Sequence, residues 1–518
     1  MGYTGETYQV PLEQGGFNHN KNIDTIPPMD HVHPSRNIWL NEGGIRKRGG
    51  TARVDTDTMG AVSVTGLFDF TLASTNQFIV RATSDGKLWK NEDDTIKTGL
   101  TVSKKVHIMQ WGDEVYFCNA ADIPTVWNGV AAGTTDIGDI PTDWTGTNYP
   151  QQMIQHGRGN SLRNWALGCP TTPKTIYVTA NGAPKDFSDA NVLTFNIETG
   201  DGFGVVGGIE FGDRLLLFGK NKSFVIDDTS TDTDEWGYSE SQWSGGAAHH
   251  RLIVRTPNDI VCMMENGEIY SVTAAQEYGD YKAASLARPS FIHEWIKTYI
   301  ALGYIADFHA VYDPTIRAIK FFMVRVGETE IDTCLAYFID RPVAKAWVIL
   351  GNEVFESGYS ALSSAVVRQS AGVWKIYTGS YAGRIWKLGE ATRSDNLEAF
   401  VSRLRTAFMA FDNARETKRY DKIKIISASE GSCDATITWW IDNAYVNEED
   451  LTFAVDGGFL GTFVLGTDVL GKANILENSV SIGALGKRIQ IEAKSSTAGE
   501  DFFLSQFLID FMQTGKRP

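Results

Sequence analysis

The sequence predicts an all-β protein: a β-propeller of six or seven blades, with an extended N-terminal arm and a C-terminal β-sandwich-like module. Glycine is frequent (51 of 518 residues), proline is rare (15), and aromatic residues reach 11%. This composition favours short strands joined by tight turns over helical bundles. In addition, one strand–turn–strand pattern recurs along the middle of the chain, and the hydrophobic pattern changes near residue 400.

Residues 1–60 form the expected N-terminal arm, because they show no regular hydrophobic period. An aperiodic segment cannot bury its own apolar side chains, so we expect it to be ordered by packing on something else and to act in assembly. The candidate interface residues are Ile38, Trp39, Leu40, Arg46, Lys47 and Arg48. The last three are the densest basic cluster of the chain and are placed to meet an acidic neighbour. Alternatively, they cap local carbonyls or lie in solvent.

Residues 61–395 carry the repeat that predicts the propeller. A turn residue, glycine, any residue, Leu or Ile, and an aromatic residue follow one another at 85–89, 266–270 and 382–386. We expect Gly86, Gly267 and Gly383 to lie in hairpin turns, where Asp-Gly and Asn-Gly pairs supply a positive φ. The apolar residue two positions later, Leu88, Ile269 or Ile385, should begin a buried strand.

The hairpins of this region recur irregularly, about 35–60 residues apart, which is typical of a propeller. One small sheet cannot bury both faces, whereas a ring of sheets buries face against face. A β-sandwich with long loops is the alternative. One helix is expected around residues 290–297, with Ser290 as its N-cap.

Residues 396–518 are expected to form the C-terminal module. Alternating apolar and polar residues predict strands at 406–411, 418–429, 435–441, 486–493 and 503–511. Alternation of this length is typical of antiparallel strands with one wet face. The module is interpreted as a β-sandwich-like domain or as an elaborated closing blade.

Charge and targeting signals restrict the class of protein. The net charge of −16 argues against a basic surface built to hold nucleic acid tightly. Five dispersed cysteines without a CxxC pair indicate core residues of a protein made in a reducing compartment. The first residues show neither a secretory signal nor a membrane span, so folding in a cytoplasm is expected.

No motif of the sequence predicts catalysis, a cofactor or a metal. Gly202-x-Gly204-x-x-Gly207 fits a dinucleotide fingerprint, but a strand follows it, whereas nucleotide binding needs a helix there. The pairs His31/His33 and His249/His250 are interpreted as packing histidines, and the acidic run 227–235 as a solvated loop. We therefore expect no enzyme. A glycosidase remains an alternative, because its two carboxylates come from distant strands and leave no local motif.

Several stretches resemble the tail-hub proteins of short-tailed bacteriophages, also called tail-nozzle or packaged-DNA stabilisation proteins. The stretches are 43–51, with its Gly-basic-Gly-Thr order, 208–219, 246–251, 258–270, 418–440 and 486–511. The resemblance implies a virion protein, made in the host cytoplasm, that forms a hexameric ring at the distal end of the tail. Such a ring continues the DNA channel, retains packaged DNA and supports fibres, spikes or a needle.

The partners that this resemblance implies are further copies of the chain, the adaptor ring on the portal side, and fibre, spike or needle proteins. Double-stranded DNA would pass through the lumen without sequence-specific binding, since an acidic wall repels phosphates. The basic cluster at 46–48 would face the next subunit or the adaptor ring. Two other functions stay open: a tail enzyme that cleaves polysaccharide (a depolymerase), and a generic propeller scaffold for protein interactions.

Overall fold

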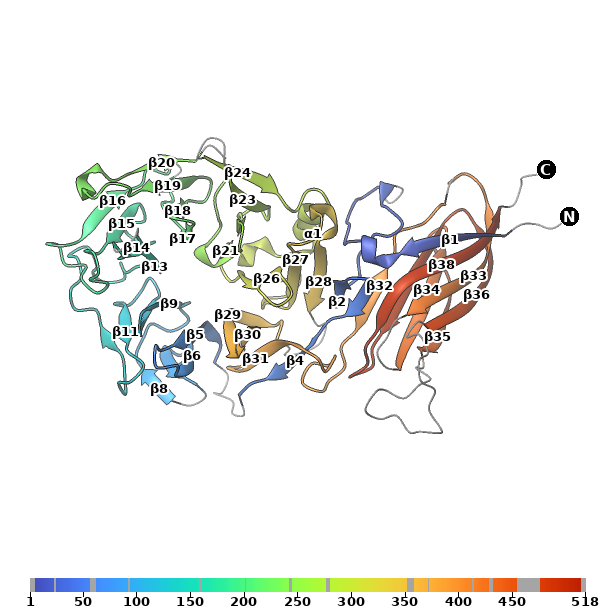
Figure 1. Cartoon of the computed structure of the whole chain (residues 1–518), viewed down its shortest axis with the longest axis horizontal. Coiled ribbons are helices and arrows are strands. Elements are labelled where there is room, and N and C mark those ends of the chain that lie inside the picture. The colour runs from blue at the N-terminus through green and yellow to red at the C-terminus, as the bar shows by residue number, and fades with distance from the viewer. Residues whose placement is uncertain are drawn as a thin grey trace.

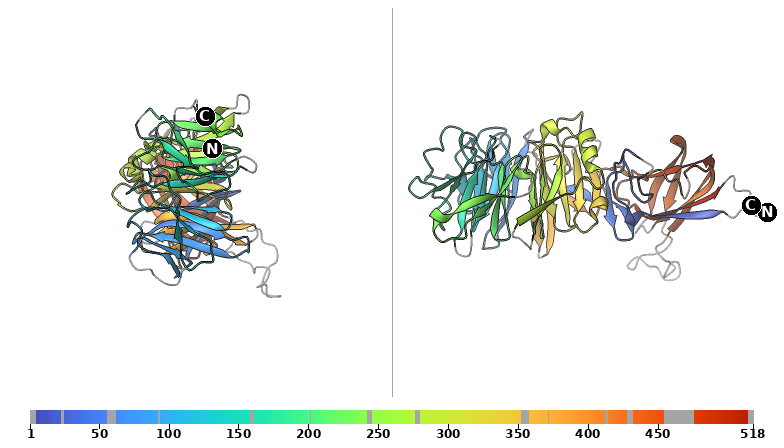
Figure 2. Two further views of the ribbon diagram at one scale, coloured as in Figure 1. Left: turned by 90° about the vertical axis from the view of Figure 1, so that its left-hand side faces the viewer. Right: turned by 90° about the horizontal axis from the view of Figure 1, so that it is seen from above.

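A computed structural model describes most of the chain. The described residues are 5–22, 25–55, 62–91, 94–157, 161–200, 202–241, 245–275, 280–351, 358–370, 372–411, 414–427, 432–453 and 476–513. They form a ring of small sheets at one end of an elongated molecule and a two-sheet module at the other end (Figures 1 and 2).

Seven four-stranded antiparallel sheets make up the ring in the described part of the chain. From the centre of the ring outward, their strands are β5 (Val64–Thr71), β6 (Gln77–Thr83), β7 (Lys87–Lys90) and β8 (Asp94–Lys97); β9 (His107–Trp111), β10 (Glu114–Cys118), β11 (Thr125–Trp127) and β12 (Thr135–Asp136); β13 (Gln152–His156), β14 (Arg163–Leu167), β15 (Thr175–Val178) and β16 (Leu193–Asn196); β17 (Gly207–Phe211), β18 (Arg214–Phe218), β19 (Ser223–Asp227) and β20 (Gly237–Glu240); β21 (Ile253–Arg255), β22 (Ile260–Met263), β23 (Ile269–Ala275) and β24 (Asp280–Ser285); β25 (His309–Asp313), β26 (Ala318–Met323), β27 (Thr333–Phe338) and β28 (Trp347–Gly351); and β29 (Ala361–Ser370), β30 (Val373–Ser380), β31 (Ile385–Glu390) and β4 (Gly50–Arg53).

The sheets close into a propeller. Each innermost strand contacts the innermost strand of the next sheet, and β29 of the last sheet contacts β5 of the first. The last sheet takes its outermost strand, β4, from the N-terminal region, with Trp386 opposite Arg53 and Leu388 opposite Thr51. The ring is therefore closed by hydrogen bonds between the two ends of the propeller chain. The prediction of an all-β propeller is confirmed.

The three repeated turns have the expected conformation. Gly86, Gly267 and Gly383 have φ values of +79°, +82° and +74°, and each connects the second and third strands of its sheet. Ile269 and Ile385 begin the third strands of their sheets, and Leu88 is the second residue of β7. All three side chains are buried, as the pattern predicts. Here the sequence determines the turn, because only glycine adopts this backbone region without strain.

The helix α1 (Ile292–Tyr299) lies where a helix is expected, but its cap is not Ser290. Phe291 occupies the N-cap position in a left-handed conformation (φ 58°) and makes no side-chain capping bond. Ser290 is buried instead, and its carbonyl accepts a hydrogen bond from the His19 backbone N–H. Tertiary packing of the N-terminal segment thus overrides the local capping preference. No helix among the described residues is long and apolar enough to cross a membrane.

The C-terminal module consists of two antiparallel sheets that share one hydrophobic core. The first contains β1 (Glu6–Pro11), β2 (Ile38–Asn41), β3 (Gly44–Lys47), β38 (Phe503–Gln513), β33 (Lys418–Ser427) and β36 (Leu476–Gly486). The second contains β32 (Ser402–Arg405), β37 (Ile489–Ser495), β34 (Cys433–Ile441) and β35 (Ala444–Phe453). Ile423 and Phe507 of the first sheet belong to the same buried cluster as Ile437 and Trp439 of the second.

The sequence suggests a separate extended arm over residues 1–60, but the described residues of this region, 5–22 and 25–55, do not form one. Its strand β1 pairs with β38, and β2 and β3 form a hairpin that continues onto β38, with Ile45 opposite Leu504. Its strand β4 completes the propeller. The region lacks a hydrophobic period because each short strand is paired with a different distant segment, and not with its neighbours along the chain.

Candidate functional site: the junction between propeller and C-terminal module

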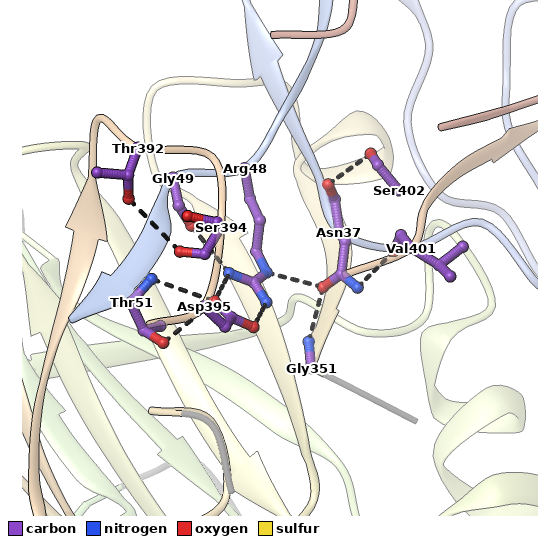
Figure 3. Close-up of polar contacts among 10 residues, drawn as sticks. All are labelled: Asn37, Arg48, Gly49, Thr51, Gly351, Thr392, Ser394, Asp395, Val401 and Ser402. Carbon is purple, nitrogen blue, oxygen red and sulfur yellow. Dashed lines mark hydrogen bonds and ion pairs between the residues drawn. The ribbon is translucent and has the colours of Figure 1, made fainter. Parts of the chain in front are cut away.

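The chain passes twice between the propeller and the C-terminal module. In the first passage, Arg48 and Gly49 separate β3 in the module from β4 in the propeller; in the second, residues 391–401 lead from β31 to β32. The two passages lie side by side (Figure 3). We call this region the junction. The six residues that the sequence singles out as an assembly interface lie in the junction or next to it.

Arg48 connects the two passages by a bidentate ion pair with Asp395. Its Nη1 lies 2.8 Å from Asp395 Oδ1, and its Nη2 lies 2.5 Å from Oδ2. The two side chains are 0% and 4% exposed. Thr51 adds its backbone N–H and its hydroxyl to Asp395 Oδ1, both at 3.1 Å. The carboxylate therefore has charged and neutral donors, as a buried charge requires.

Asn37 extends the same network to the propeller and to β32 (Figure 3). Its Oδ1 accepts hydrogen bonds from Arg48 Nε at 2.9 Å and from the Gly351 N–H at 3.0 Å. Its Nδ2 donates to the Val401 carbonyl, and its own carbonyl accepts from the Ser402 hydroxyl. Asn37 has a φ of 56°, a region that asparagine tolerates better than most residues.

Two aromatic rings cover the Arg48 guanidinium. Its central carbon lies 3.7 Å from the centre of the Phe400 ring and 4.5 Å from that of Tyr359. Burial opposes the charged form of Arg48, but the Asp395 carboxylate stabilises that form and the pKa of Arg48 lies above its usual value. The guanidinium stays protonated and fixed, which suits a structural role.

The other two cations of the basic cluster are also used within the chain. Arg46 makes a bidentate pair with Asp501 next to β38, at 2.8 and 2.6 Å. Lys47 donates to the Thr497 carbonyl at 2.7 Å and lies over the Phe400 ring. Burial and the neighbouring charge of Arg48 lower the pKa of Lys47 to about 8.

The three apolar candidates lie on β2 beside this network. Ile38 and Leu40 are buried in the main hydrophobic cluster, and the half-buried Trp39 packs against it. Ile38, Leu40, Lys47 and Arg48 are buried within the chain, so for these four the prediction of a partner-facing surface is corrected. The reason for their burial is that distant parts of the sequence, Asp395 among them, return to β2 and β3 in the fold. That Trp39 and Arg46, which keep some exposed surface, face a partner stays a prediction.

The residues that sequence reasoning missed are Asn37 and Asp395. Asp395 lies 347 positions after Arg48, in a polar turn that carries no motif. Asn37 precedes a strand and looks like an ordinary turn residue. Only closure of the propeller brings these side chains together, so no local pattern indicates them.

A groove of about 310 Å³ lies next to the network. It is bordered by His33 and Arg36 of the N-terminal segment, by Tyr299 of α1, and by Glu328 and Asp332 of the propeller. Asp332 is paired with Arg325 Nε at 2.5 Å and also accepts the Arg325 N–H. Burial, and to a smaller extent Glu328, raise the pKa of Asp332 in spite of Arg325.

The described residues contain no group of three or more His, Cys, Asp or Glu side chains placed to hold a metal. All five cysteines are buried and unpaired, as expected for core residues. Gly207, at the end of the glycine run 202–207, begins strand β17, so no helix follows the run. The pairs His31/His33 and His249/His250 lie in packed surroundings, with His33 stacked on Tyr299 at 4.4 Å.

Comparison of the sequence with protein-family models and with curated proteins gave no match. Among solved structures, the chain is similar to the N-terminal domain of Nup159 (11% identity, 67% of this chain and 95% of that chain, TM-score 0.37). It is also similar to YCF48 from Cyanidioschyzon merolae (10% identity, 65% of this chain and 98% of that chain, TM-score 0.39). A third similar structure is BBS1N in complex with ARL6DN (10% identity, 66% of this chain and 98% of that chain, TM-score 0.42). These neighbours are β-propeller proteins, and likeness at this level concerns the fold alone.

Proposed function

We propose that this chain is a structural protein of a bacteriophage virion, a subunit of a ring at the distal end of a short tail. The ring would continue the DNA channel, retain packaged DNA, and support fibres, spikes or a needle. The chain would be made in the host cytoplasm and would not be an enzyme. The sequence resemblance supplies this function, and the architecture of the junction supports it.

The observation that carries the proposal is the double passage of the chain through the junction. A single flexible linker would let the propeller and the module move independently. Two adjacent passages, tied by the buried Arg48–Asp395 pair and by Asn37, remove that freedom. A rigid body of two modules suits a tail subunit, because such a subunit must transmit force between its propeller and its C-terminal module without bending at a hinge.

The charge of the chain agrees with a passive role toward DNA. A net charge of −16 disfavours adhesion of phosphates to the surface, so DNA could pass without being held. The basic residues that could have formed a DNA contact at 46–48 are neutralised by Asp501 and Asp395 or bound to a carbonyl.

The oligomeric mass of the purified chain tests the proposal. We expect native mass spectrometry and negative-stain images to show closed rings of about six copies, since a channel needs rotational symmetry. Antibody against the chain should label the tip of the tail in phage particles. A chain that stays monomeric at all concentrations, together with absence of label on particles, would contradict the tail-ring proposal and favour a generic propeller scaffold.

The alternative of a polysaccharide-active enzyme has one observation in its favour, the groove that contains Glu328 and Asp332. A glycosidase needs two carboxyl groups on either side of the bond that it cleaves. Because Asp332 is already held by Arg325, we expect no release of reducing ends from host surface polysaccharide. Cleavage that Asp332→Asn abolishes, but the surface control Asp340→Asn does not, would favour the enzyme.

A further inference from the structure

Polar side chains cross the central channel of the propeller at one end. They come from the first residues of innermost strands or from the residues just before those strands. We call this set the cross-channel layer: Lys105, His107, His249, His250, Arg251 and His309. Beyond the layer the channel continues as a cavity of about 500 Å³, which Gln110, Gln155 and Glu210 line further along their strands.

The two cations of the layer join sheets that are not neighbours in the ring. Lys105, just before β9, donates to the Ala306 carbonyl at 3.0 Å and forms an ion pair with Asp307, and both of these residues precede β25. Arg251, just before β21, donates from Nη2 to the Leu362 carbonyl of β29. These contacts run across the channel, whereas the contacts of the β-sheets run around it.

The histidines add two more contacts between sheets that are not neighbours. The ring of His107, at the start of β9, lies edge-on to the ring of His250, with their centres 5.4 Å apart. His249 Nε2 lies 2.7 Å from Nε2 of Gln151, which precedes β13. The rings of His249 and His250 are themselves 4.2 Å apart. The layer therefore obstructs this end of the channel and connects opposite sides of the ring.

His249 supports the layer in its neutral form. Its Nδ1 accepts a hydrogen bond from the Arg251 backbone N–H at 3.3 Å, which caps a single 3-10 turn over His250–Leu252. A backbone N–H can only donate, and a protonated imidazole carries a hydrogen on both of its nitrogens. Protonation of Nδ1 would break this contact and loosen the turn that carries His250 and Arg251.

The charges that face the histidines balance one another at neutral pH. Lys105 and Arg251 are positive, Asp307 pairs with Lys105, and Glu210 lies on the wall further along the channel. Tyr381 lies near Arg251 and is neutral, because burial raises its pKa to about 12. Each proton taken up by a histidine would add a positive charge beside two cations that are already there, and this repulsion opposes the closed layer.

Burial also disfavours the charged form of these rings. His250 and His309 are 7% and 3% exposed. Burial, and after it the two nearby cations, lower the pKa of His249 to about 3, and burial lowers that of His107 to about 4. The rings are thus neutral in the closed layer, whereas in an open and hydrated layer each would take up a proton below about pH 6.5.

From this arrangement we infer that the cross-channel layer is an acid-sensitive closure of the propeller channel. Its neutral histidines hold the contacts between opposite sheets, and acidification loosens these contacts while the sheets stay folded. The advantage of the closed layer is complete above about pH 6.5 and shrinks as the pH falls toward 4. The inference does not rest on the tail-ring proposal, because it concerns the inside of one propeller.

The size of the effect follows from the titration of one histidine. If opening of the layer returns one ring from a pKa of about 4 to its ordinary value, the open fraction rises about 20-fold between pH 7 and pH 5. Opening that frees several rings gives a larger change. Local opening of this kind is visible in the exchange of backbone amides.

Hydrogen–deuterium exchange of the full chain at pH 7, 6 and 5, followed by mass spectrometry, tests this inference. Protection factors remove the change of the intrinsic exchange rate with pH. We expect the protection of peptides over residues 105–111 and 249–255 to fall by about 20-fold or more between pH 7 and pH 5. Peptides over β27 and β37 are the reference within the same molecule and should change by less than about threefold.

Substitutions separate protonation from packing. Asparagine is a good N-cap residue and does not titrate, so His249→Asn should reduce the pH effect by about 10-fold or more. His107→Gln removes another titrating ring and serves as a second variant if His249→Asn does not fold. His293→Gln is the matched control: this histidine of α1 pairs with Glu294 outside the layer, so the pH effect should stay within about twofold of the wild-type value.

A reduced pH effect in either folded variant, with the full effect in His293→Gln, supports the inference. Absence of a selective loss of protection down to pH 5 would overturn it. So would an equal loss in the reference peptides, since the propeller would then unfold as a whole. A pH effect in folded His249→Asn and His107→Gln proteins that equals that of His293→Gln would also overturn it, because the layer would then open without protonation of its histidines.

Discussion

Arg48 connects the two chain passages of the junction, and we expect the stability of the junction to depend on it. Its guanidinium is fully buried, contacts Asp395 and Asn37, and lies between the rings of Phe400 and Tyr359. A buried ion pair contributes little net stability when compared with an apolar pair of the same size. Removal of one partner is different, because the other charge is left buried without compensation.

Arg48→Met should therefore lower the free energy of unfolding by about 3–5 kcal/mol, since Asp395 would remain as an unpaired buried carboxylate. Urea denaturation at pH 7 measures the change. The double variant Arg48→Met/Asp395→Leu removes both charges and should recover a large part of the loss. If the double variant is as unstable as the sum of the single variants, the pair is not the source of the effect.

Buried histidines predict how stability depends on pH. Burial, with Arg341 as a smaller cause, lowers the pKa of His31 from 6.5 to about 3, and burial lowers that of His107 to about 4. In the unfolded chain both groups take up a proton below about pH 6.5, whereas the folded chain does so only near pH 3–4. Their neutral forms thus favour the fold above pH 6.5, and this advantage shrinks as the pH falls below it.

We expect the free energy of unfolding to fall by about 1.4 kcal/mol per pH unit for each such histidine between pH 6 and pH 4.5. Urea denaturation at several pH values measures this slope. His31→Leu should reduce this slope by about 1.4 kcal/mol per pH unit, the contribution of one proton taken up on unfolding. An unchanged slope in a folded His31→Leu protein would show that His31 does not resist protonation in the native state.

At the scale of the element, the repeated hairpin turns follow from local chemistry. Gly267 connects β22 and β23 with a φ of +82°, and a Cβ added there would lie 2.7 Å from Ile296 Cγ2 of α1. Backbone strain and side-chain crowding therefore act in the same direction at this position.

Gly267→Val should destabilise the protein by about 1–3 kcal/mol, because valine in the left-handed region is strained. The melting temperature by circular dichroism reports the loss. Gly237→Val is a suitable control, since Gly237 at the start of β20 has no positive φ and an added Cβ would meet no atom within 4 Å. Equal shifts in the two variants would contradict the assigned role of the turn.

Strands differ in how far the sequence identifies them. Alternation predicts 418–429, 435–441, 486–493 and 503–511, and β33, β34, β37 and β38 lie there. The stretch 406–411 is wrong as a strand: β32 ends at Arg405, and Met409 forms only an isolated bridge with Ile489. The edge strands β35 and β36 are not predicted. In β35 almost every residue is exposed, so the strand shows little alternation. In β36 inward and outward positions alternate, but inward positions such as Asn478, Ala484 and Gly486 carry small or polar residues, which weakens the apolar pattern.

At the scale of the whole molecule, one buried cluster runs from the propeller into the C-terminal module. It includes Trp295 and Trp347 of the propeller side, Ile38 and Ile45 of the N-terminal region, and Trp439 of the module. Continuous apolar burial couples the two parts, since neither can unfold without exposing surface of the other.

We therefore expect a single transition when the intact chain is unfolded in a calorimeter. Deletion of residues 1–49 removes β1, β2, β3 and Arg48, so the module should then melt before the propeller or fail to fold. The deletion also uncovers apolar residues of β38, which dye binding detects. Two well-separated transitions in the intact protein would show that the junction does not couple its two sides.

The sequence by itself determined the all-β class, the repeated hairpins with their turn glycines, and the alternating strands of the C-terminal module. These features rest on neighbours in the chain: a positive φ needs glycine where it occurs, and a strand with one wet face alternates. Only the tertiary structure decided where the N-terminal strands pair, which acids neutralise Arg46 and Arg48, and which side chains line the centre of the propeller. Those contacts join residues hundreds of positions apart in the sequence, so they form only when the ring closes. A local sequence pattern therefore cannot indicate them.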